Sequence, residues 1–511
     1  MNHSGVYLGL EMGSTRIKAV GIDSKHRPVV TGDYTWQSSF ENGVWTYDLD
    51  EVWSGIRAAV SQMQAKDDIV GMGVSGMMHG YLAFDKDWRL LTPFRTWQNT
   101  STGQAAEELT DLFRFNVPQR WSIAHLYQAM LNAETHVKDI AHITTLAGYV
   151  HVSLTGVNAV GIGEASGIFP IDSNTLDYDE AMLEKFDTLA KGMHCPWHIK
   201  DLLPRVLQAG DAAGFLTPEG ASRLDGQLNA GIPFAPAEGD AGTGMAATNA
   251  VAARTGNVSA GTSIFAMVVL EHALKNVHPE IDVLTTPGGK PVAMVHCNNG
   301  TNDMNAWVKV LRETAALFGV EVSPGEAFTK LYQKSLEGAA DAGGILVFNY
   351  LAGEGVTSFN EGRPMVIRTP GSSFTLANFL RAQLYSSMAT LRIGMDLLSQ
   401  ENVAIDRLMG HGGLFKTPIV AQRYLAAACN VPVTCMETAG EGGPYGMALL
   451  TAFMLNKKNG ETLESYLADS VFADAESTTL APEAPDVQGF NSFLEYYKRG
   501  LAVERSAVEN L

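Results

Sequence analysis

The chain has 511 residues, with 36 basic and 55 acidic side chains and a formal charge of −19. Hydrophobic residues make up 46% and charged residues 18%, a balance typical of folded proteins and not of disordered ones. At about 100–200 residues per domain, this length predicts two or three domains with a large buried core. The acidic excess argues against nucleic acid or an anionic membrane surface as a partner, because both favour clustered Lys and Arg. The acidic excess does not exclude a phosphate-containing ligand, because backbone amides and a metal ion can hold phosphate without a net basic charge.

The cysteines and the apolar segments indicate a cytoplasmic protein. Four cysteines in a chain of this length do not form a disulfide framework. The N-terminal residues lack a basic region, and Glu11 interrupts their short apolar stretch, so we expect no signal peptide. The most apolar segments, around 260–270 and 445–455, fall short of the ~18 residues that a membrane span needs.

Strands and helices are predicted in alternation along the first half. Residues 6–23 contain two β-rich runs around a Gly-Ser-Thr turn and predict a hairpin. The next predicted elements are a helix over 48–64, a strand over 69–76 and a helix over 102–113. Residues 171–240 are richer in Pro, Asp and Gly, and we place the domain boundary just after the turn that ends them, between residues 246 and 247.

The second half opens on a hairpin of the same kind, over 255–270, in which two apolar runs flank Gly261-Thr262-Ser263. The further predicted elements are helices over 302–319, 375–400, 417–430 and 443–455, and strands over 407–413 and 431–437. Strands that alternate with helices of this length indicate an α/β architecture. Two similar hairpins suggest two similar domains, 1–246 and 247–511, and we expect the tail beyond about residue 470 to be peripheral.

The two Gly-Ser/Thr turns are the best chemical signal. A tight turn of this composition offers N–H groups and hydroxyls close to the backbone, which suits a triphosphate. Taken alone, either turn is more often an ordinary hairpin turn than a nucleotide site. Taken together, the two turns make a nucleotide site and an ordinary pair of hairpins about equally good interpretations. A third element, over 408–418, is a strand that enters a glycine-rich turn and then a helix, without the spacing of a P-loop or of G-x-G-x-x-G.

Together these segments resemble the FGGY family of carbohydrate kinases, and most closely its xylulokinase branch, in order from about residue 6 to residue 455. Residues 6–23 and 259–265 are similar to the family's two phosphate hairpins, and 408–418 to its adenosine loop. Other segments that resemble the family are the sugar-site turn 74–80, the Trp-containing substrate loop 94–99, the Gly-Asp segment 238–246 and the L-x-G-E segment 351–356.

The resemblance implies a two-domain α/β fold of the actin- and hexokinase-like (ribonuclease H-like) ATPase type, with an interdomain cleft. It implies that Asp240 is the general base, which accepts the proton of a sugar hydroxyl as that hydroxyl attacks the γ-phosphoryl group of ATP. The implied sugar-binding residues are Met78, His79, Trp97, Asn99 and Asp240. The implied nucleotide-binding residues are Ser14, Thr15, Lys18, Gly261, Thr262, Gly412, Gly413 and Lys416. Glu11 would serve Mg²⁺. The oligomeric state is left open, with a homodimer as the option that the resemblance suggests, and we expect the protein to bind neither nucleic acid nor membrane.

Several of these residues have structural alternatives. Asp240 precedes Ala-Gly-Thr-Gly, and without the resemblance a turn or helix-cap aspartate is favoured. His79 follows a buried-looking strand and could satisfy a backbone carbonyl, and Trp97 could pack in the core. The His-Cys-Pro-Trp-His run over 194–198 superficially suggests a metal site, but no second cluster completes a tetrahedral set.

The sequence departs from the family at several of these positions. Glu11 stands where the family has Asp, and the extra methylene shifts the carboxylate by about 1.5 Å, which matters because misplacement of ~1 Å can cost a hundredfold in rate. An outer-sphere carboxylate tolerates such a change, because Mg²⁺ often keeps several waters. Gln98-Asn99 replaces the usual Asn-Asp, and Ala241 replaces the Asn after the base. Because these changes alter the groups that bond to sugar hydroxyls, the resemblance does not determine which sugar is the substrate.

We therefore expect an ATP- and Mg²⁺-dependent kinase that phosphorylates a terminal hydroxyl of a ketopentose, with D-xylulose as the leading case. The first alternative is a kinase for another ketose or for a polyol. The second is a sugar- or nucleotide-sensing protein whose chemistry is weakened by Glu11.

Overall fold

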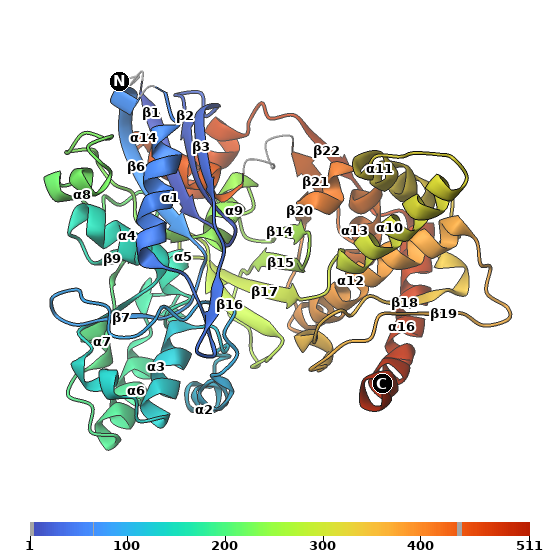
Figure 1. Cartoon of the computed structure of the whole chain (residues 1–511), viewed down its shortest axis with the longest axis horizontal. Helices are drawn as coiled ribbons and strands as arrows, with labels where there is room; N and C mark the ends of the chain where they lie inside the picture. Colours follow the sequence, from blue (N-terminus) through green and yellow to red (C-terminus); the bar gives the residue numbers. More distant parts are fainter. Residues whose placement is uncertain (1–4, 65, 437–441) are drawn as a thin grey trace. The chain divides into compact units, whose positions relative to one another are not determined.

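The computed structural model describes residues 5–64, 66–436 and 442–511 and divides into two compact units (Figure 1). The first unit comprises Met1–Ala252, Asp282–Val292 and Glu441–Asp474. The second comprises Ala253–Ile281, Ala293–Gly440 and Ala475–Leu511. This division differs from the expected one, because residues 247–252, Asp282–Val292 and Glu441–Asp474, which the sequence assigned to the second domain, belong to the first unit.

A mixed sheet forms the centre of the first unit. Its strands lie in the order β13 (Glu238–Gly239), β6 (Ile69–Gly76), β1 (Val6–Met12), β2 (Arg16–Ile22) and β3 (Pro28–Thr35). β1 pairs antiparallel with β2 and parallel with β6, which in turn pairs parallel with β13. The expected first hairpin and the expected strand over 69–76 are confirmed.

Helices cover this sheet with apolar faces. α1 (Leu49–Ser61) begins at Asp48, whose side chain caps the helix by accepting a hydrogen bond from the backbone N–H of Asp50. α14 (Gly443–Asn456) is buried along most of its length and packs against β1, β6 and α9 (Asp240–Ala247). The approach is close: a Cβ on Gly9 would lie 2.0 Å from the carbonyl oxygen of Pro444.

The remaining elements of the first unit are shorter or lie beside the sheet. They are β4 (Ser39–Glu41), β5 (Val44–Thr46), β7 (Leu82–Phe84), α2 (Gly103–Phe113), α3 (Ser122–Leu131), β8 (His142–Thr144), α4 (Leu146–Thr155), β9 (Ala159–Gly161), α5 (Ile162–Ala165), β10 (Ile171–Asp172), β11 (Asp177–Tyr178), α6 (Glu180–Gly192), α7 (Ile199–Leu202), β12 (Arg205–Leu207), α8 (Pro218–Arg223) and α15 (Leu463–Tyr466). α6 lies inside the segment that the sequence analysis treated only as rich in Pro, Asp and Gly.

The sheet of the second unit repeats the same arrangement. Its strands lie in the order β17 (Pro291–Cys297), β15 (Ile264–Val269), β14 (Thr255–Ala260), β20 (Arg407–His411), β21 (Val433–Met436) and β22 (Ser477–Leu480). β16 (Ile281–Thr285) falls almost entirely within the Asp282–Val292 segment of the first unit. β14 pairs antiparallel with β15 and parallel with β20, as β1 does with β2 and β6. Each hairpin found in the sequence therefore forms the centre of one sheet.

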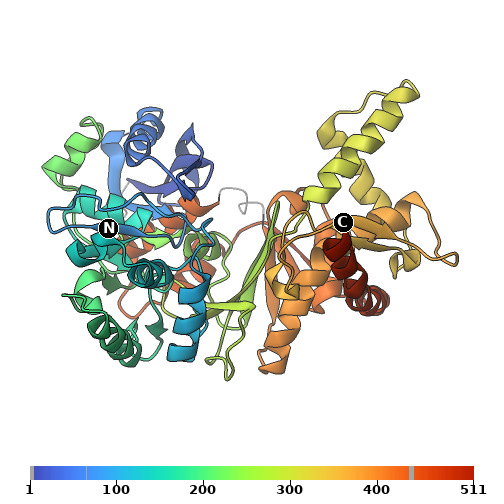
Figure 2. The same cartoon turned by 60° about the horizontal axis from the view of Figure 1, so that its bottom comes forward.

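The core of the second unit contains the long helix α12 (Leu376–Gln400), with α13 (Val420–Cys429) and α16 (Ala484–Asn510) packed against it. α16 is not peripheral, contrary to the expectation for the tail: Phe490, Phe493, Leu494 and Tyr497 are buried at helical spacing. Figure 2 shows α10 (Asn302–Leu317) and α11 (Pro324–Ser335), in yellow, projecting from the rest of this unit. In the same unit, β18 (Leu346–Phe348) pairs antiparallel with β19 (Met365–Ile367).

Most of the predicted helices form within a few residues of their expected bounds. The helix expected over 417–430 begins only at Val420, after a short 3-10 turn over Gly413–Lys416. The strand expected over 431–437 forms as β21, and Glu437 lies outside the described residues. No helix in the described ranges combines the length and the hydropathy needed to cross a membrane.

Candidate active site

Asp240 is the first residue of α9 and directly follows β13. Its Oδ1 accepts a hydrogen bond of 3.2 Å from the backbone N–H of Met78. Burial raises the pKa of Asp240, and the N–H groups of Met78 and Ala241 oppose that rise. The N-cap of α9 is Gly239, so the interpretation of Asp240 as a cap residue is not supported. A carboxylate with a raised pKa, held by backbone N–H groups, has the properties of a general base.

The sugar-site turn expected from the sequence follows the end of β6. Met78 and His79 are both buried, and His79 has a φ of 68°, a left-handed conformation that costs a non-glycine residue about 1–3 kcal/mol. The Nδ1 of His79 lies 3.3 Å from the carbonyl oxygen of Gly167, and its ring stacks on Trp121 with centroids 6.2 Å apart. The expected contact with a backbone carbonyl is present, and the strained backbone shows that the turn is held by its surroundings.

An arginine that sequence reasoning missed lies beside this turn. The backbone N–H of Gly80 donates to the carbonyl oxygen of Arg120 at 3.1 Å, and the hydroxyl of Ser122 donates to the carbonyl oxygen of Gly80 at 2.5 Å. The guanidinium of Arg120 pairs with Asp282, and burial lowers the pKa of Arg120 to about 10. No local motif marks Arg120, because only the fold brings its loop to the sugar-site turn.

The substrate loop 94–99 places its polar groups differently from the expectation. Asn99 is buried, and its amide bridges to Trp45: Oδ1 accepts from the Trp45 N–H at 2.8 Å, and Nδ2 donates to the Trp45 carbonyl at 2.8 Å. These bonds occupy the amide and favour a structural role for Asn99. Trp97 is 37% exposed, which argues against core packing. Gln98 Oε1 is buried and has no hydrogen-bond partner in the described part of the chain.

Glu11 lies on β1 opposite Lys18 on β2. A Cβ on Gly443 would lie 2.2 Å from Glu11 Oε1, so the carboxyl lies against the first residue of α14. Burial and the negative charge of Asp240 raise the pKa of Glu11 to about 7, and the charge of Lys18 opposes this rise.

The carboxyls of Glu11 and Asp240 fit a magnesium ion whose other ligands are phosphate oxygens and water. Within the described residues, no three or more His, Cys, Asp or Glu side chains form a group that could hold a metal ion. Glu11 and Asp240 repel each other, and a divalent cation stabilises two such carboxylates. Mg²⁺ in kinases is commonly held by one or two carboxylates, with phosphate oxygens and water as its other ligands.

The turn of the first hairpin directs its carbonyl oxygens inward. The indole N–H of Trp36 donates to Gly13 O at 2.7 Å, and the hydroxyl of Tyr47 donates to Ser14 O at 2.7 Å. Ser14 is half-buried and Thr15 is exposed. The turn is thus fixed from one side, while Thr15 can meet a ligand on the other.

In the second unit, two glycine-containing turns lie at the same sheet edge. The carbonyl oxygens of Gly261 and Thr262 accept hydrogen bonds from the N–H groups of Thr301 and Gly300, at 2.9 and 2.8 Å. Gly412 has a φ of 98°, and a Cβ there would lie 2.6 Å from the carbonyl oxygen of Ala260, the last residue of β14. Ligands of open α/β sheets bind at such carboxyl ends of strands.

The remaining residues of these turns are accessible. Gly413, Lys416 and the Thr262 side chain are exposed, and a Cβ on Gly413 would meet no atom within 4 Å. The structure therefore brings Glu11, Asp240 and the sugar-site turn together in the first unit. It brings the second hairpin turn and Gly412 together in the second unit.

Two fully buried carboxyls near Asp240, Glu164 and Glu238, also escaped sequence reasoning. Burial raises the pKa of Glu238 to about 8 and that of Glu164 well above its usual range. Glu238 lies in the Gly-Asp segment 238–246, but nothing in that segment indicates that its carboxyl accepts a hydrogen bond from the backbone N–H of Glu164.

Comparison with known proteins accounts for both units. Profiles of the FGGY family of carbohydrate kinases match residues 6–247 with the N-terminal domain and residues 256–455 with the C-terminal domain. The chain is 22% identical to the xylulose kinase of Haemophilus influenzae, over 96% of this chain and 98% of that protein. A xyloylose kinase structure from Brucella ovis superposes with a TM-score of 0.80 at 19% identity, covering 98% of this chain and 100% of that one. A gluconate kinase structure from Lactobacillus acidophilus has a TM-score of 0.80 at 16% identity, covering 98% of both chains.

The class of protein is therefore that of the sugar kinases, with the two-domain actin- and hexokinase-like fold. The chain belongs to the FGGY family of carbohydrate kinases, because the two profiles together match most of its length. The expected family and fold class are confirmed. FGGY kinases use ATP as the phosphate donor, and the acceptor is a small sugar-like molecule.

Proposed function

We propose that the protein transfers the γ-phosphoryl group of ATP to a terminal hydroxyl of a ketopentose, with D-xylulose, giving D-xylulose 5-phosphate, as the leading case. The observation that carries the proposal is the contact between Asp240 and the sugar-site turn, through the N–H of Met78. A base beside the turn that holds the sugar is what transfer to a hydroxyl requires. The similarity to the xylulose kinase of Haemophilus influenzae over nearly the full chain supports the choice of sugar.

In this reaction Asp240 accepts the proton of the attacking hydroxyl. The new bond forms between the sugar oxygen and the γ-phosphorus, the bond from that phosphorus to the bridging oxygen breaks, and ADP leaves. The raised pKa of Asp240 makes it a stronger base than an exposed aspartate. Met78 and His79 hold the sugar, and their strained turn keeps the acceptor hydroxyl in one orientation.

The chain's own residues divide the remaining work. In the first unit, Ser14, Thr15 and Lys18 bind phosphate through N–H groups, hydroxyls and one ammonium group. In the second unit, Gly261 and Thr262 bind phosphate through N–H groups and a hydroxyl. Gly412, Gly413 and Lys416 bind the adenosine side. Glu11 is the residue that would hold Mg²⁺, which when bound offsets the negative charge of the transferring phosphoryl group.

A second candidate is a kinase for another ketose or for a polyol, and the substrate loop supports it. Gln98 Oε1 is a buried acceptor without a partner in the described residues, while the amide of Asn99 is occupied by Trp45. An acceptor of this kind discriminates strongly between sugars that place a hydroxyl opposite it and sugars that do not.

The test is sugar-stimulated ADP release with Mg-ATP. The panel contains D-xylulose, L-xylulose, D-ribulose and L-ribulose, together with ketohexoses, polyols and gluconate, and a no-sugar control. The highest kcat/KM on D-xylulose supports the leading case, and the position of the phosphate on the product is read by NMR. The highest value on another compound supports the second candidate. No stimulation by any compound, with ATP binding intact, would contradict both and favour a sensing role.

Two further properties stay predictions. The homodimer is tested by sedimentation velocity of the purified protein, and the cytoplasmic location by fractionation of the source cells.

A further inference from the structure

Three glycines enclose two buried carboxyls behind the proposed sugar site. Glu164 lies on α5 and Glu238 on β13, and both are almost completely buried. A Cβ on Gly161 would lie 2.0 Å from Glu238 Oε1, and one on Gly163 would lie 2.5 Å from Glu238 Oε2. A Cβ on Gly239 would lie 2.5 Å from Glu164 Oε2. No side chain fits at these three positions without displacing a carboxyl.

Glu238 holds α5 in place. Its Oε2 accepts a hydrogen bond of 3.0 Å from the backbone N–H of Glu164, and the N–H of Gly163 also contacts this carboxyl. Two further contacts fix the same segment: Thr285 Oγ1 donates to the carbonyl oxygen of Ile162 at 2.9 Å, and the Thr285 N–H donates to Ser166 Oγ at 3.1 Å. α5 is therefore a fixed support.

The side chain of Glu164 extends from this support to the catalytic segment. The same Cβ on Gly239 would lie 2.2 Å from Met78 Cγ, so Glu164 and Met78 both pack on the backbone of Gly239. Gly239 immediately precedes Asp240, whose Oδ1 accepts the N–H of Met78. The carboxyl of Glu164 thus adjoins both the peptide that carries the base and the sugar-site turn.

The surroundings of Glu164 favour an uncharged carboxyl. Burial raises its pKa well above the usual range, the charges of Glu238 and Asp240 add to that rise, and the hydroxyl of Thr145 opposes it. Tyr178 is also fully buried nearby. An uncharged Glu164 can lie against the segment of Asp240 without repelling its carboxylate.

We propose that Glu164 is a positioning residue for phosphoryl transfer: by filling the space against Gly239 and Met78, it fixes the base relative to the sugar-site turn. The inference rests on the proposed function. Removal of the side chain leaves the peptide before Asp240 free to shift, and misplacement of a catalytic group by about 1 Å can lower a rate about a hundredfold.

The experiment compares Glu164→Gln with Glu164→Ala in the full chain. Glutamine keeps the shape of the uncharged carboxyl, so we expect kcat within about threefold of the parent. Alanine should lower kcat by about 30- to 100-fold and leave KM for ATP unchanged, because the adenosine-side residues lie in the other unit. A conserved kcat in Glu164→Ala, or an equal loss in both variants, would overturn the proposal.

Amide hydrogen exchange provides a readout that does not depend on turnover. Glu164→Ala should accelerate exchange in residues 74–80 and 238–246, above all at the N–H of Met78, and Glu164→Gln should not. Unchanged exchange in Glu164→Ala would overturn the positioning role. If the parent protein phosphorylates none of the sugars tested, the proposed function fails, and the exchange result still decides whether Glu164 fixes this segment.

Glu504 supplies the matched control. It is completely buried in the second unit, where its Oε1 accepts the N–H of Arg363 at 2.7 Å. Glu504→Ala should lower Tm while leaving kcat and the exchange of residues 74–80 at parent values. If Glu164→Ala does not fold, Glu164→Asp takes its place in the comparison with Glu164→Gln. Aspartate is shorter by one methylene, so the expected loss in kcat is smaller than for alanine.

Discussion

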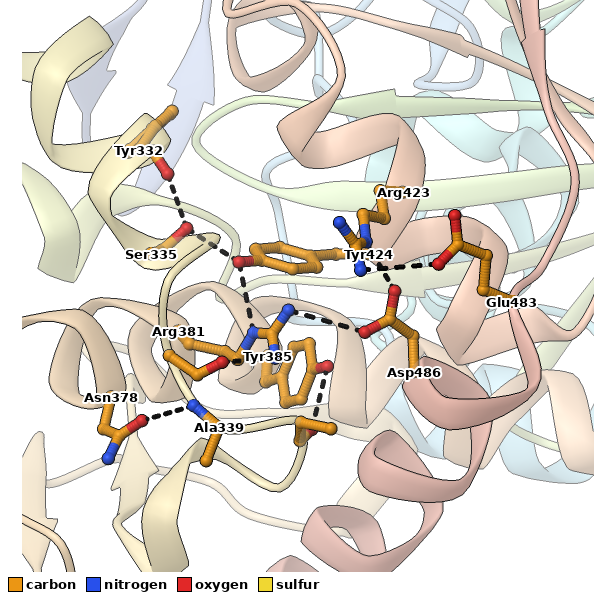
Figure 3. A network of polar contacts seen from close by, with 12 residues as sticks. Tyr332, Ser335, Ala339, Asn378, Arg381, Tyr385, Arg423, Tyr424, Glu483 and Asp486 are labelled. Carbon is orange, nitrogen blue, oxygen red and sulfur yellow. Dashed lines mark hydrogen bonds and ion pairs between the residues drawn. The ribbon is translucent and has the colours of Figure 1, made fainter.

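The two units each bury a group of charged side chains, and the groups differ in their partners. In the second unit, Arg381 and Asp486 are 3% and 4% exposed and lie 3.5 Å apart, between α12 and α16. Figure 3 shows that Arg423 of α13 reaches the same carboxylate, with Nε 2.5 Å from Asp486 Oδ2. Arg381 also donates to the hydroxyl of Tyr424 and to the carbonyl oxygen of Gly338, at 3.2 and 2.9 Å. Every charge in this network therefore has an opposite charge beside it.

In the first unit, four buried carboxyl groups lie together, and within the described residues none of them forms an ion pair with a basic side chain. Glu11, Glu164, Glu238 and Asp240 lie near one another, and burial raises the pKa of each of them. Lys18 opposes this rise at Glu11, and backbone N–H groups oppose it at Glu238 and Asp240.

The difference separates a structural role from a functional one. Opposite charges that satisfy each other hold α16 to the core and leave no group poised to react. Carboxyl groups that share a buried site cost stability when they ionise, and such sites are where catalytic acids, bases and metal ligands are found.

The largest expected effect on stability is in the second unit. Asp486→Asn keeps the shape of the side chain but leaves the guanidinium of Arg381 buried without a counter-charge. We expect a loss of about 3–5 kcal/mol in the free energy of unfolding, measured by urea denaturation. kcat of the remaining folded protein should be unchanged, because no residue of the proposed site lies in this network.

Glu483→Ala is the matched control for that prediction. Glu483 also pairs with Arg423, at 3.5 Å, but its side chain is 65% exposed. Exposed pairs contribute little, so a loss of about 0–1 kcal/mol is expected. Equal losses in the free energy of unfolding of Asp486→Asn and Glu483→Ala would show that burial of an ion pair does not determine its contribution to stability.

The next effect concerns the pH dependence of stability in the first unit. The folded-state pKa of Glu238 is about 8, above its ordinary value of 4.5, so between these values the folded state binds more protons than the unfolded state. The stability that this proton contributes is full below about pH 4.5 and is lost as the pH rises towards 8. The side chain in Glu238→Gln cannot titrate, so between pH 5 and pH 8 the Tm of this variant should fall less than the Tm of the parent. The two falls in Tm should differ by at least about 2 °C, which corresponds to ~1 kcal/mol in the free energy of unfolding.

The measurement is a series of thermal melts from pH 5 to 8 without divalent cations. Glu107→Gln, an exposed carboxyl on α2 outside the group, serves as the control. Parallel curves for the parent and Glu238→Gln would contradict the assignment of an uncharged Glu238.

The smallest effect concerns the uncharged hairpin turn of the second unit. Thr262→Ala removes one hydroxyl from the proposed phosphate contact, and a hydrogen bond of this kind contributes about 0.5–1.5 kcal/mol. We expect KM for ATP to rise about 3- to 10-fold, with kcat and Tm unchanged. Thr314→Ala, an exposed threonine on α10, should leave KM at the parent value. A fall in kcat with unchanged KM would place Thr262 in the chemical step.

Local features were predictable from the sequence. Both hairpins follow from β-rich runs around a short glycine-containing turn, and each became the centre of a sheet. Asp240 was expected in a turn, and the structure instead places it at the start of α9, directly after β13. The expectation that the tail is peripheral was wrong, although Phe490, Phe493 and Tyr497 recur at the helical spacing that indicates a buried face.

Features that depend on distant contacts were not predictable. Glu164 and Glu238 meet across 74 residues of sequence, and no pattern near either residue announces the contact. The amide of Asn99 was expected to bind sugar, but it bonds to the backbone of Trp45, 54 residues away. In each case the partner is a backbone group or a carboxyl that only the fold brings within reach.

The central claim is that the group of buried carboxyls in the first unit, Glu11, Glu164, Glu238 and Asp240, contains the catalytic base. The most direct test is sugar-dependent ADP release by Asp240→Asn, with ATP and sugar binding measured in parallel by calorimetry. Loss of the base should lower kcat by about 10²- to 10⁴-fold while both ligands still bind and Tm stays the same or rises. Turnover within tenfold of the parent protein would contradict the account.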